Sequence, residues 1–238
     1  MTTDKNPSEF TVIGHRGSAG LAPENTLASI RLALSKGVRY VEIDLQRSKD
    51  GVLMIMHDRS VNRTTNGRGA VSELTWSQLQ ALDAGSWFSP ELPCELIPNL
   101  ESALKLVHQA GAVLIVEVKY PQLYPGLAKE LDTLIHNIDA SKNVLVMSFN
   151  RGFMKELSEL NPDYPLGCLY VVPPHPKSVE LSYASYVSVF WRLAFLFPNR
   201  LRQLRAQGIT TWAWTINRPD HIHQARKQGF NGVVTDFV

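Results

Sequence analysis

The chain of 238 residues lacks three features that would place it in a special class of protein. It has only two cysteines, Cys94 and Cys168, which are too few for a disulfide framework and favour a reducing compartment. No apolar run approaches the roughly 20 residues of a membrane span, since the closest, 187–198, is short and contains Arg192. The formal net charge of +2 provides no strong field for nucleic acid or a membrane surface.

The N-terminal residues MTTDKNPSEF are polar, and they contain no apolar segment of the kind found in secretory signals. With the features above, this predicts a cytoplasmic protein without stable membrane insertion and without a nucleic-acid partner. A hydrophobic content of 44% and a single even composition predict one globular domain over residues 1–238.

One pattern recurs along the chain: a helix-like segment ends in glycine and an apolar, β-branched run follows. Gly37, Gly111, Gly208 and Gly229 fit the left-handed position that follows a helix. Near-continuous apolar runs are typical of parallel strands covered by helices. The fold predicted is an α/β (β/α)₈ TIM barrel, with a doubly wound open sheet as the alternative. Its expected strands are 10–14, 39–45, 113–118, 144–148, 166–171, 186–190, 210–215 and 232–235.

The run 52–58 follows the second strand too closely for a parallel crossover, so it must return antiparallel. Asp50-Gly51 is typical of a two-residue hairpin turn, and that turn would place His57 opposite Asp44. Residues 59–97 then break the βα rhythm and predict a small insertion near the barrel mouth. Long excursions in compact domains are usually functional.

Carboxylates gather at the predicted carboxyl ends of strands, where barrel active sites lie. Glu42 and Asp44 are two residues apart and share one face of a strand, and Glu117 ends the next strand. An oxygen-rich group without thiolates suits a hard divalent cation, Mg²⁺ or Ca²⁺. The alternative is that the carboxylates form ion pairs with Arg16 and Lys119.

Two histidines follow strand ends beside this acidic group: His15, which adjoins an arginine, and His57. Imidazoles exchange protons near neutral pH, so the pair could divide the roles of general base and general acid. Either could also be a structural histidine. Trp214 at another strand end is compatible with a core position or with a pocket wall.

These residues together resemble the glycerophosphodiester phosphodiesterase family. The matching stretches are GHRGSAGLAPENT, VRYVEIDLQRSKDGVLMIMHD, NRTTNGRGAV, IPNLESAL, LIVEVK, TWAWTIN and GVVTD. The resemblance implies a (β/α)₈ barrel with an insertion at about 59–97, and a divalent cation held by Glu42, Asp44 and Glu117. It implies acid–base roles for His15 and His57, phosphate contacts from Arg16 and Lys119, and a pocket wall at Trp214. This chain ends Asp236-Phe237-Val238 where the family often continues TDxP, so the resemblance leaves the role of Asp236 open.

The activity implied by the resemblance is hydrolysis of glycerophosphodiesters to glycerol 3-phosphate and an alcohol. Two alternatives remain: a lysophospholipase D-type enzyme whose aromatic segment 190–197 meets an acyl chain, and a non-catalytic barrel that binds a phosphate ligand. A small-molecule glycerophosphodiester is the expected partner, and the sequence leaves open whether the chain forms a homo-oligomer.

Overall fold

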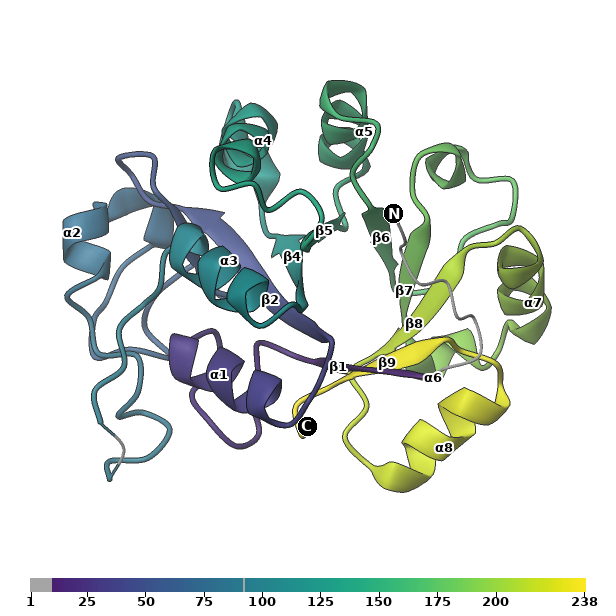
Figure 1. The fold of residues 1–238 in the computed structure, drawn as a ribbon, viewed down its shortest axis with the longest axis horizontal. Coiled ribbons are helices and arrows are strands. Elements are labelled where there is room, and N and C mark those ends of the chain that lie inside the picture. Colours follow the sequence, from purple (N-terminus) through teal and green to yellow (C-terminus); the bar gives the residue numbers. More distant parts are fainter. Residues whose placement is uncertain (1–9, 92) are drawn as a thin grey trace.

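The computed structural model describes residues 10–91 and 93–238, which form a closed barrel of parallel strands with helices around the outside (Figure 1). Strand β1 pairs in parallel with both β2 and β9, and these pairings close the ring. The parallel strands are β1 (Thr11–Gly14), β2 (Tyr40–Arg47), β4 (Val113–Val118), β5 (Val144–Ser148), β6 (Leu166–Tyr170), β7 (Tyr186–Phe190), β8 (Thr210–Trp214) and β9 (Gly232–Thr235). The predicted TIM barrel is therefore confirmed, and each of the eight expected strands is present within two residues of its bounds.

Helices lie between most consecutive strands along the chain. They are α1 (Leu27–Ser35), α2 (Trp76–Leu79), α3 (Leu100–Gln109), α4 (Leu127–Asn137), α5 (Arg151–Leu160), α6 (Trp191–Ala194), α7 (Pro198–Ala206) and α8 (Pro219–Lys227). The short 3₁₀ segments are η1 (Val71–Glu73), η2 (Pro121–Leu123) and η3 (Val179–Ser182).

Local sequence signals set the ends of the helices. The Thr26 hydroxyl caps α1 by accepting a hydrogen bond from the Ser29 N–H at 3.2 Å. Gly37 and Gly111, just after α1 and α3, have φ of +80° and +65°. Only glycine adopts this conformation without steric cost, so each helix ends there and the chain turns into the next strand.

Alternation along the strands separates two apolar layers. Val41, Ile43 and Leu45 of β2 pack against the surrounding helices. The interior of the barrel is filled by a different set: Ile13, Ile115, Leu145, Met147, Leu169, Trp212 and Val234. Some residues of β2 face inward but do not belong to this apolar set. They therefore need polar or charged neighbours.

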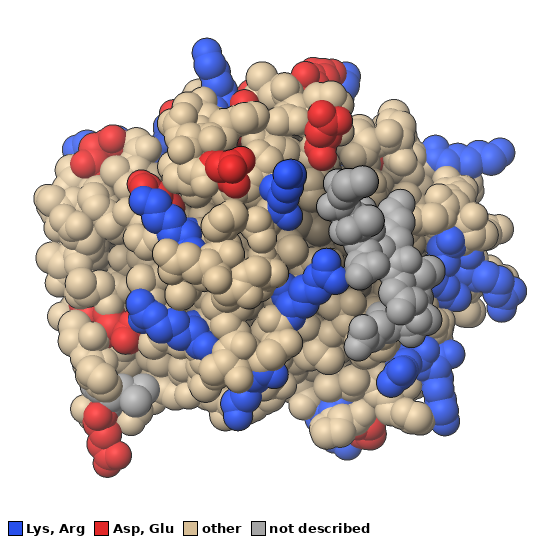
Figure 2. Space-filling model, in the orientation of Figure 1, with Lys and Arg blue, Asp and Glu red and all other residues tan. Residues whose placement is uncertain are grey.

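Helix α7 shows how the outer layer divides between core and solvent. Its leucines Leu201 and Leu204 are buried in a cluster with residues of β7 and β8. Its sequence PNRLRQLRA also supplies three arginines. Lys and Arg side chains are frequent on the right of the face shown in Figure 2, where α7 lies in Figure 1. Elsewhere on that face, basic and acidic side chains are interspersed with neutral residues.

The predicted hairpin forms, but its predicted register was wrong. Strand β3 (Leu53–Ile55) runs antiparallel to β2 with Leu45 opposite Ile55. The Met56 N–H donates to the Asp44 carbonyl at 2.9 Å, so Met56 occupies the place expected for His57. The loop contains an extra residue: the Ser48 N–H donates to the Val52 carbonyl, and Gly51 has a φ of +91°. A three-residue loop with glycine in the left-handed position shifts the pairing by one residue.

Segment 59–97 packs over β3 and shares a small apolar core with the hairpin. Its members are Met54, Met56, Val61, Val71, Leu79, Ala84 and Ile97. In the described residues, no helix is long and apolar enough to cross a membrane. The polar N-terminus discussed above lies, up to residue 9, outside the described residues.

Candidate active site

Three carboxylates converge at the mouth of the barrel. Glu42, Asp44 and Glu117 are buried, and each offers one oxygen within 4.8 Å of the other two. Parallel pairing explains this convergence, because Asp44 lies directly beside Glu117 in the register of β2 and β4. Strand periodicity places Glu42 on the same face as Asp44, one layer deeper.

The two cations predicted for this region lie in contact with the carboxylates. The Lys119 ammonium is 2.5 Å from Glu117 Oε1 and 3.2 Å from Asp44 Oδ1. Arg16 Nε is 3.1 Å from Asp44 Oδ2, and the Arg16 backbone N–H donates to Glu42 Oε2 at 2.9 Å. The ion pairs foreseen as the alternative reading are therefore present, and they arrange the acidic group in the structure.

The pKa values of the three carboxyl groups are pushed apart. Burial and the negative charge of Asp44 raise the pKa of Glu42 well above its ordinary value. Burial opposes ionisation of Asp44 as well, but Lys119 and Arg16 outweigh it and lower its pKa. Burial also raises the pKa of Glu117, although Lys119 counteracts it. This site holds its negative charge at a cost, and Asp44 is the member kept ionised.

The same residues fit a divalent cation. Glu42 Oε1 is buried without a hydrogen-bond partner, and Asp44 Oδ1 accepts no hydrogen bond and has only the ion pair with Lys119 at 3.2 Å, which is costly for carboxylate oxygens. All three side chains offer oxygen, the donor that hard cations prefer. A cation between them would satisfy the orphaned oxygens and relieve the mutual repulsion.

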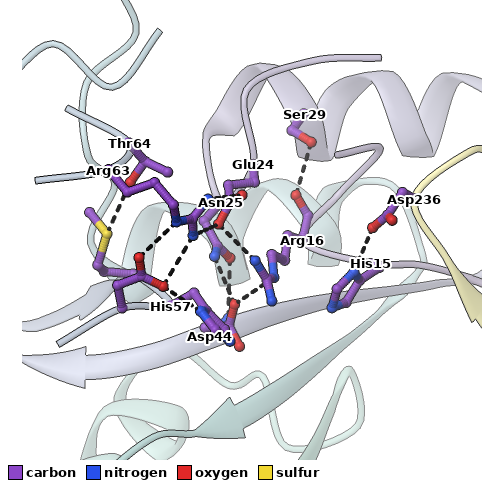
Figure 3. Close-up of polar contacts among 12 residues, drawn as sticks. His15, Arg16, Glu24, Asn25, Ser29, Asp44, His57, Arg63, Thr64 and Asp236 are labelled. Atoms are coloured by element: carbon purple, nitrogen blue, oxygen red, sulfur yellow. Dashed lines mark hydrogen bonds and ion pairs between the residues drawn. The ribbon is translucent and has the colours of Figure 1, made fainter. Parts of the chain in front are cut away.

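Each predicted histidine has a carboxylate on its Nδ1. His15 Nδ1 lies 2.6 Å from Asp236 Oδ1, and His57 Nδ1 lies 2.6 Å from Asp58 Oδ1 (Figure 3). An ionised carboxylate only accepts hydrogen bonds, so Nδ1 carries the proton in each pair. The Nε2 atom of each ring is then the nitrogen that can exchange a proton with a ligand.

The environment of His15 favours its charged form. Burial by itself lowers the pKa of His15, but the hydrogen bond to Asp236 and the charge of Glu42 outweigh burial and raise it. The His15 Nε2 atom is 4.0 Å from Glu42 Oε2, so the ring lies beside the acidic group. Asn217 Nδ2 donates to Asp236 Oδ2 at 2.5 Å and fixes the carboxylate that orients this ring.

A pocket of about 610 Å³, partly open to solvent, joins the charged residues to an apolar wall. Trp214 stands in this wall with ring centroids 5.9 Å from Phe149 and 5.4 Å from Phe190. Of the residues predicted for the site, the lining includes His15, Arg16, Glu42, His57, Glu117, Lys119 and Trp214, and Asp44 lies immediately behind them. The structure therefore brings all eight predicted residues together.

The aromatic segment 190–197 contributes no residue to the pocket lining, although Phe190 contacts the wall residue Trp214. Trp191 and Ala194 of α6 are buried in a cluster with Val189 and Leu201. Phe195 packs against the same cluster and lies 5.3 Å from the Trp191 ring. The segment is therefore mainly part of the layer between barrel and helices.

Sequence reasoning missed several polar residues around the site. Asn25 Nδ2 donates to Asp44 Oδ2 at 2.8 Å, and Glu24 accepts from Arg16 at 2.8 Å. Both belong to the PENT stretch at 23–26, and neither was predicted to serve the site. The sequence feature that could have revealed them is an acid followed by an amide, close to a strand end that already carries several charged residues.

Comparison with known proteins places this geometry in a family. The model of the glycerophosphoryl diester phosphodiesterase family matches residues 15–238. The protein YhdW of Bacillus subtilis (strain 168) is 35% identical over 234 residues, covering 95% of this chain and 94% of its own. A glycerophosphodiester phosphodiesterase of Caldanaerobacter subterraneus subsp. tengcongensis is 30% identical, with 94% and 93% covered. Among solved structures, an Oleispira antarctica phosphodiesterase in complex with the product sn-glycerol-3-phosphate has a TM-score of 0.83 and 31% identity, with 95% and 93% covered.

Proposed function

The chain belongs to the glycerophosphoryl diester phosphodiesterase family, and on that premise we propose that it hydrolyses glycerophosphodiesters to glycerol 3-phosphate and an alcohol in this pocket. The observation that carries the proposal is the pair of carboxylate-bound imidazoles beside the acidic group. A barrel that merely binds phosphate needs cations, but it needs no oriented pair of proton-exchanging groups.

Glu42, Asp44 and Glu117 are the proposed ligands of a divalent cation, Mg²⁺ or Ca²⁺. When bound, such a cation neutralises charge on the phosphodiester and stabilises the additional charge of the transition state. The chain supplies Arg16 and Lys119 at the same place, and both line the pocket. The planar fork of Arg16 suits two phosphoryl oxygens, while the Lys119 ammonium acts as a point charge.

The two histidines are proposed to divide proton transfer. His15 adjoins Arg16, and in its neutral form, with the proton on Nδ1, its Nε2 atom is proposed to remove the proton of the group that attacks the bound phosphorus. His57 then protonates the departing alcohol through Nε2, because an alkoxide is a poor leaving group. Asp236 and Asp58 hold the two rings in the orientation that presents Nε2 and stabilise each imidazolium as it forms.

Trp214 is proposed to contact the substrate from the apolar side of the pocket. Its ring, Phe149 and Leu169 cover the side opposite the charged residues. This division into a polar and an apolar half orients a diester whose phosphate faces the cations.

A product assay tests the proposal. Purified protein is incubated with several glycerophosphodiesters, with added Mg²⁺ or Ca²⁺ and in excess chelator, and glycerol 3-phosphate is measured. We expect release of glycerol 3-phosphate that stops in chelator and returns with the cation. Absence of glycerol 3-phosphate from every diester would refute the activity, and full turnover in chelator after exhaustive dialysis would refute the cation.

A further inference from the structure

Arg63 lies outside the pocket lining, yet it contacts two carboxylates that serve the site (Figure 3). Its Nε and Nη2 atoms donate to Asp58 at 2.7 and 3.1 Å. Its Nη1 and Nη2 atoms donate to Glu24 at 2.8 and 2.7 Å. A single guanidinium therefore makes two bidentate pairs, in two directions.

The two carboxylates lead to opposite parts of the site. Asp58 holds His57 through Nδ1 at 2.6 Å. Glu24 holds the side chain of Arg16 at 2.8 Å, and the oxygen that accepts from Arg16 also accepts from Arg63. The residues of this hydrogen-bonded network come from the loop after β1, from the end of the hairpin and from segment 59–97. Arg63 is the group through which these three segments are joined by charge-assisted hydrogen bonds.

We infer that Arg63 is a positioning residue for the proposed hydrolysis, and that it fixes His57 relative to Arg16. The inference rests on the proposed function. A proton donor is effective when it lies within hydrogen-bond reach of the leaving oxygen, and that oxygen is placed by the groups that bind the phosphate. Asp58 and Glu24 orient these two partners, and Arg63 orients both carboxylates at once.

The charge of Arg63 has a second consequence for Arg16. Arg16 lies between Glu24 and Asp44, which together carry more negative charge than one guanidinium can balance. Arg63 balances part of the charge of Glu24, so that Arg16 retains positive charge for a phosphate. Arginine is suited to this place because its fork meets two carboxylates in fixed directions, whereas a lysine would offer one point charge.

The Arg63 side chain is 43% exposed, which limits the effect expected on stability. Exposed ion pairs contribute little to the free energy of unfolding. Positioning, however, acts on the transition state, where small displacements of an acid or of a phosphate ligand reduce the rate strongly. Replacement of Arg63 should therefore alter kcat far more than it alters thermal unfolding.

The test compares three variants of the full chain: R63Q, R63K and the control R68Q. Arg68 belongs to the same segment, is also exposed, and loses the same charge in the control. Each is assayed on glycerophosphocholine, which releases an alcohol, and on a nitrophenyl phosphodiester, whose leaving group needs almost no proton. Thermal unfolding is followed in parallel.

We expect R63Q to lower kcat on glycerophosphocholine by about 10- to 100-fold, the range typical for residues that orient a functional group. The loss on the nitrophenyl diester should be several-fold smaller, because His57 acts on the leaving group. R63K should recover only part of kcat, and R68Q should match the wild type. R63K also provides the comparison if R63Q does not fold.

Wild-type kcat for R63Q on both substrates would overturn the positioning role, and so would wild-type kcat for R63K, because charge alone would then suffice. Equal losses on both substrates would overturn the link through His57. If neither the wild type nor R68Q releases glycerol 3-phosphate, the proposed function itself has failed. If both release it, any failure concerns Arg63 alone.

Discussion

The substitution E42Q tests whether the acidic group is built for a cation. It replaces a buried carboxyl, which must either be charged beside Asp44 or carry a costly proton, with a neutral amide of the same shape. The three carboxylates approach within 4.8 Å of one another. An ionised Glu42 would repel a second carboxylate at that distance by roughly 3.5 kcal/mol at an effective dielectric constant of about 20, and this repulsion is one cause of its raised pKa. Arg16 and Lys119 offset part of this repulsion. We therefore expect E42Q to stabilise the cation-free protein by about 1 to 3 kcal/mol.

Hydrogen bonding at Glu42 also favours E42Q in the cation-free protein. Glu42 Oε2 already accepts the Arg16 N–H at 2.9 Å, and Oε1 has no hydrogen-bond partner. A glutamine keeps its oxygen at the first position and places an N–H₂ group at the second. That group can donate to the neighbouring carboxylates, where the native oxygen repels them.

A bound cation offsets this advantage of E42Q by stabilising the wild type. A ligand at about 100 times its Kd stabilises the folded state by about 2.7 kcal/mol. For a domain of this size, each kcal/mol moves Tm by about 2 to 4 °C, so Mg²⁺ or Ca²⁺ should raise the wild-type Tm by roughly 5 to 11 °C. E42Q should lose most of that increase, because a neutral amide is a poorer ligand for a hard cation.

The assay is thermal unfolding of both proteins in excess chelator and in saturating Mg²⁺ or Ca²⁺. The matched control is E101Q, since Glu101 forms an exposed ion pair with Lys105 at 2.5 Å on α3. The control should retain the full cation-induced increase in Tm. A wild-type Tm that ignores both cations, or an E42Q variant that keeps the increase, would refute the reasoning.

Three further predictions concern protons at the site. H15A and H57A should each lower kcat on glycerophosphocholine by about 10² to 10⁴. On a nitrophenyl diester the loss of kcat should be much smaller for H57A and about the same for H15A. If each variant loses equally on both substrates, the proposed division of roles is wrong. D236N should lower kcat by part of the factor lost in H15A, because the His15 ring is no longer held, while Tm changes little. An unchanged kcat would show that the 2.6 Å contact between His15 and Asp236 does not orient the ring. Burial and Asp44 raise the pKa of Glu42, so its uncharged form persists to higher pH and a cation must displace the proton. Cation affinity measured by calorimetry should therefore rise with pH. An affinity that does not change with pH would contradict this prediction.

Strand periodicity predicted the site because it is a local property of the chain. Alternation along β2 predicted that Glu42 and Asp44 share the inner face, and Val41 and Ile43 pack outward as expected. Parallel strands bring their carboxyl ends to one edge, so Glu117 on β4 could be expected beside Asp44. The glycines that end helices could also be predicted from the sequence, because a positive φ depends on one residue and its immediate neighbours.

Register and long-range partners were decided by the tertiary structure. The loop around Gly51 has one more residue than the Asp-Gly turn predicted, and this single residue placed Met56 where His57 was expected. His57 reaches the pocket because the chain leaves β3 at Ile55 and bends. The difference between two loop geometries is a small balance of backbone energies that composition does not reveal.

What the sequence determined by itself was the number of strands, the inward face of β2 and β4, and the set of charged groups at one end of the barrel. What only the tertiary structure decided was how those groups pair. His15 meets Asp236 across 221 residues because closure of the ring places β1 beside β9, and Arg63 meets Glu24 because segment 59–97 folds back over the first loop. Such pairs depend on where the whole barrel brings distant segments together, whereas periodicity depends only on neighbours along the chain.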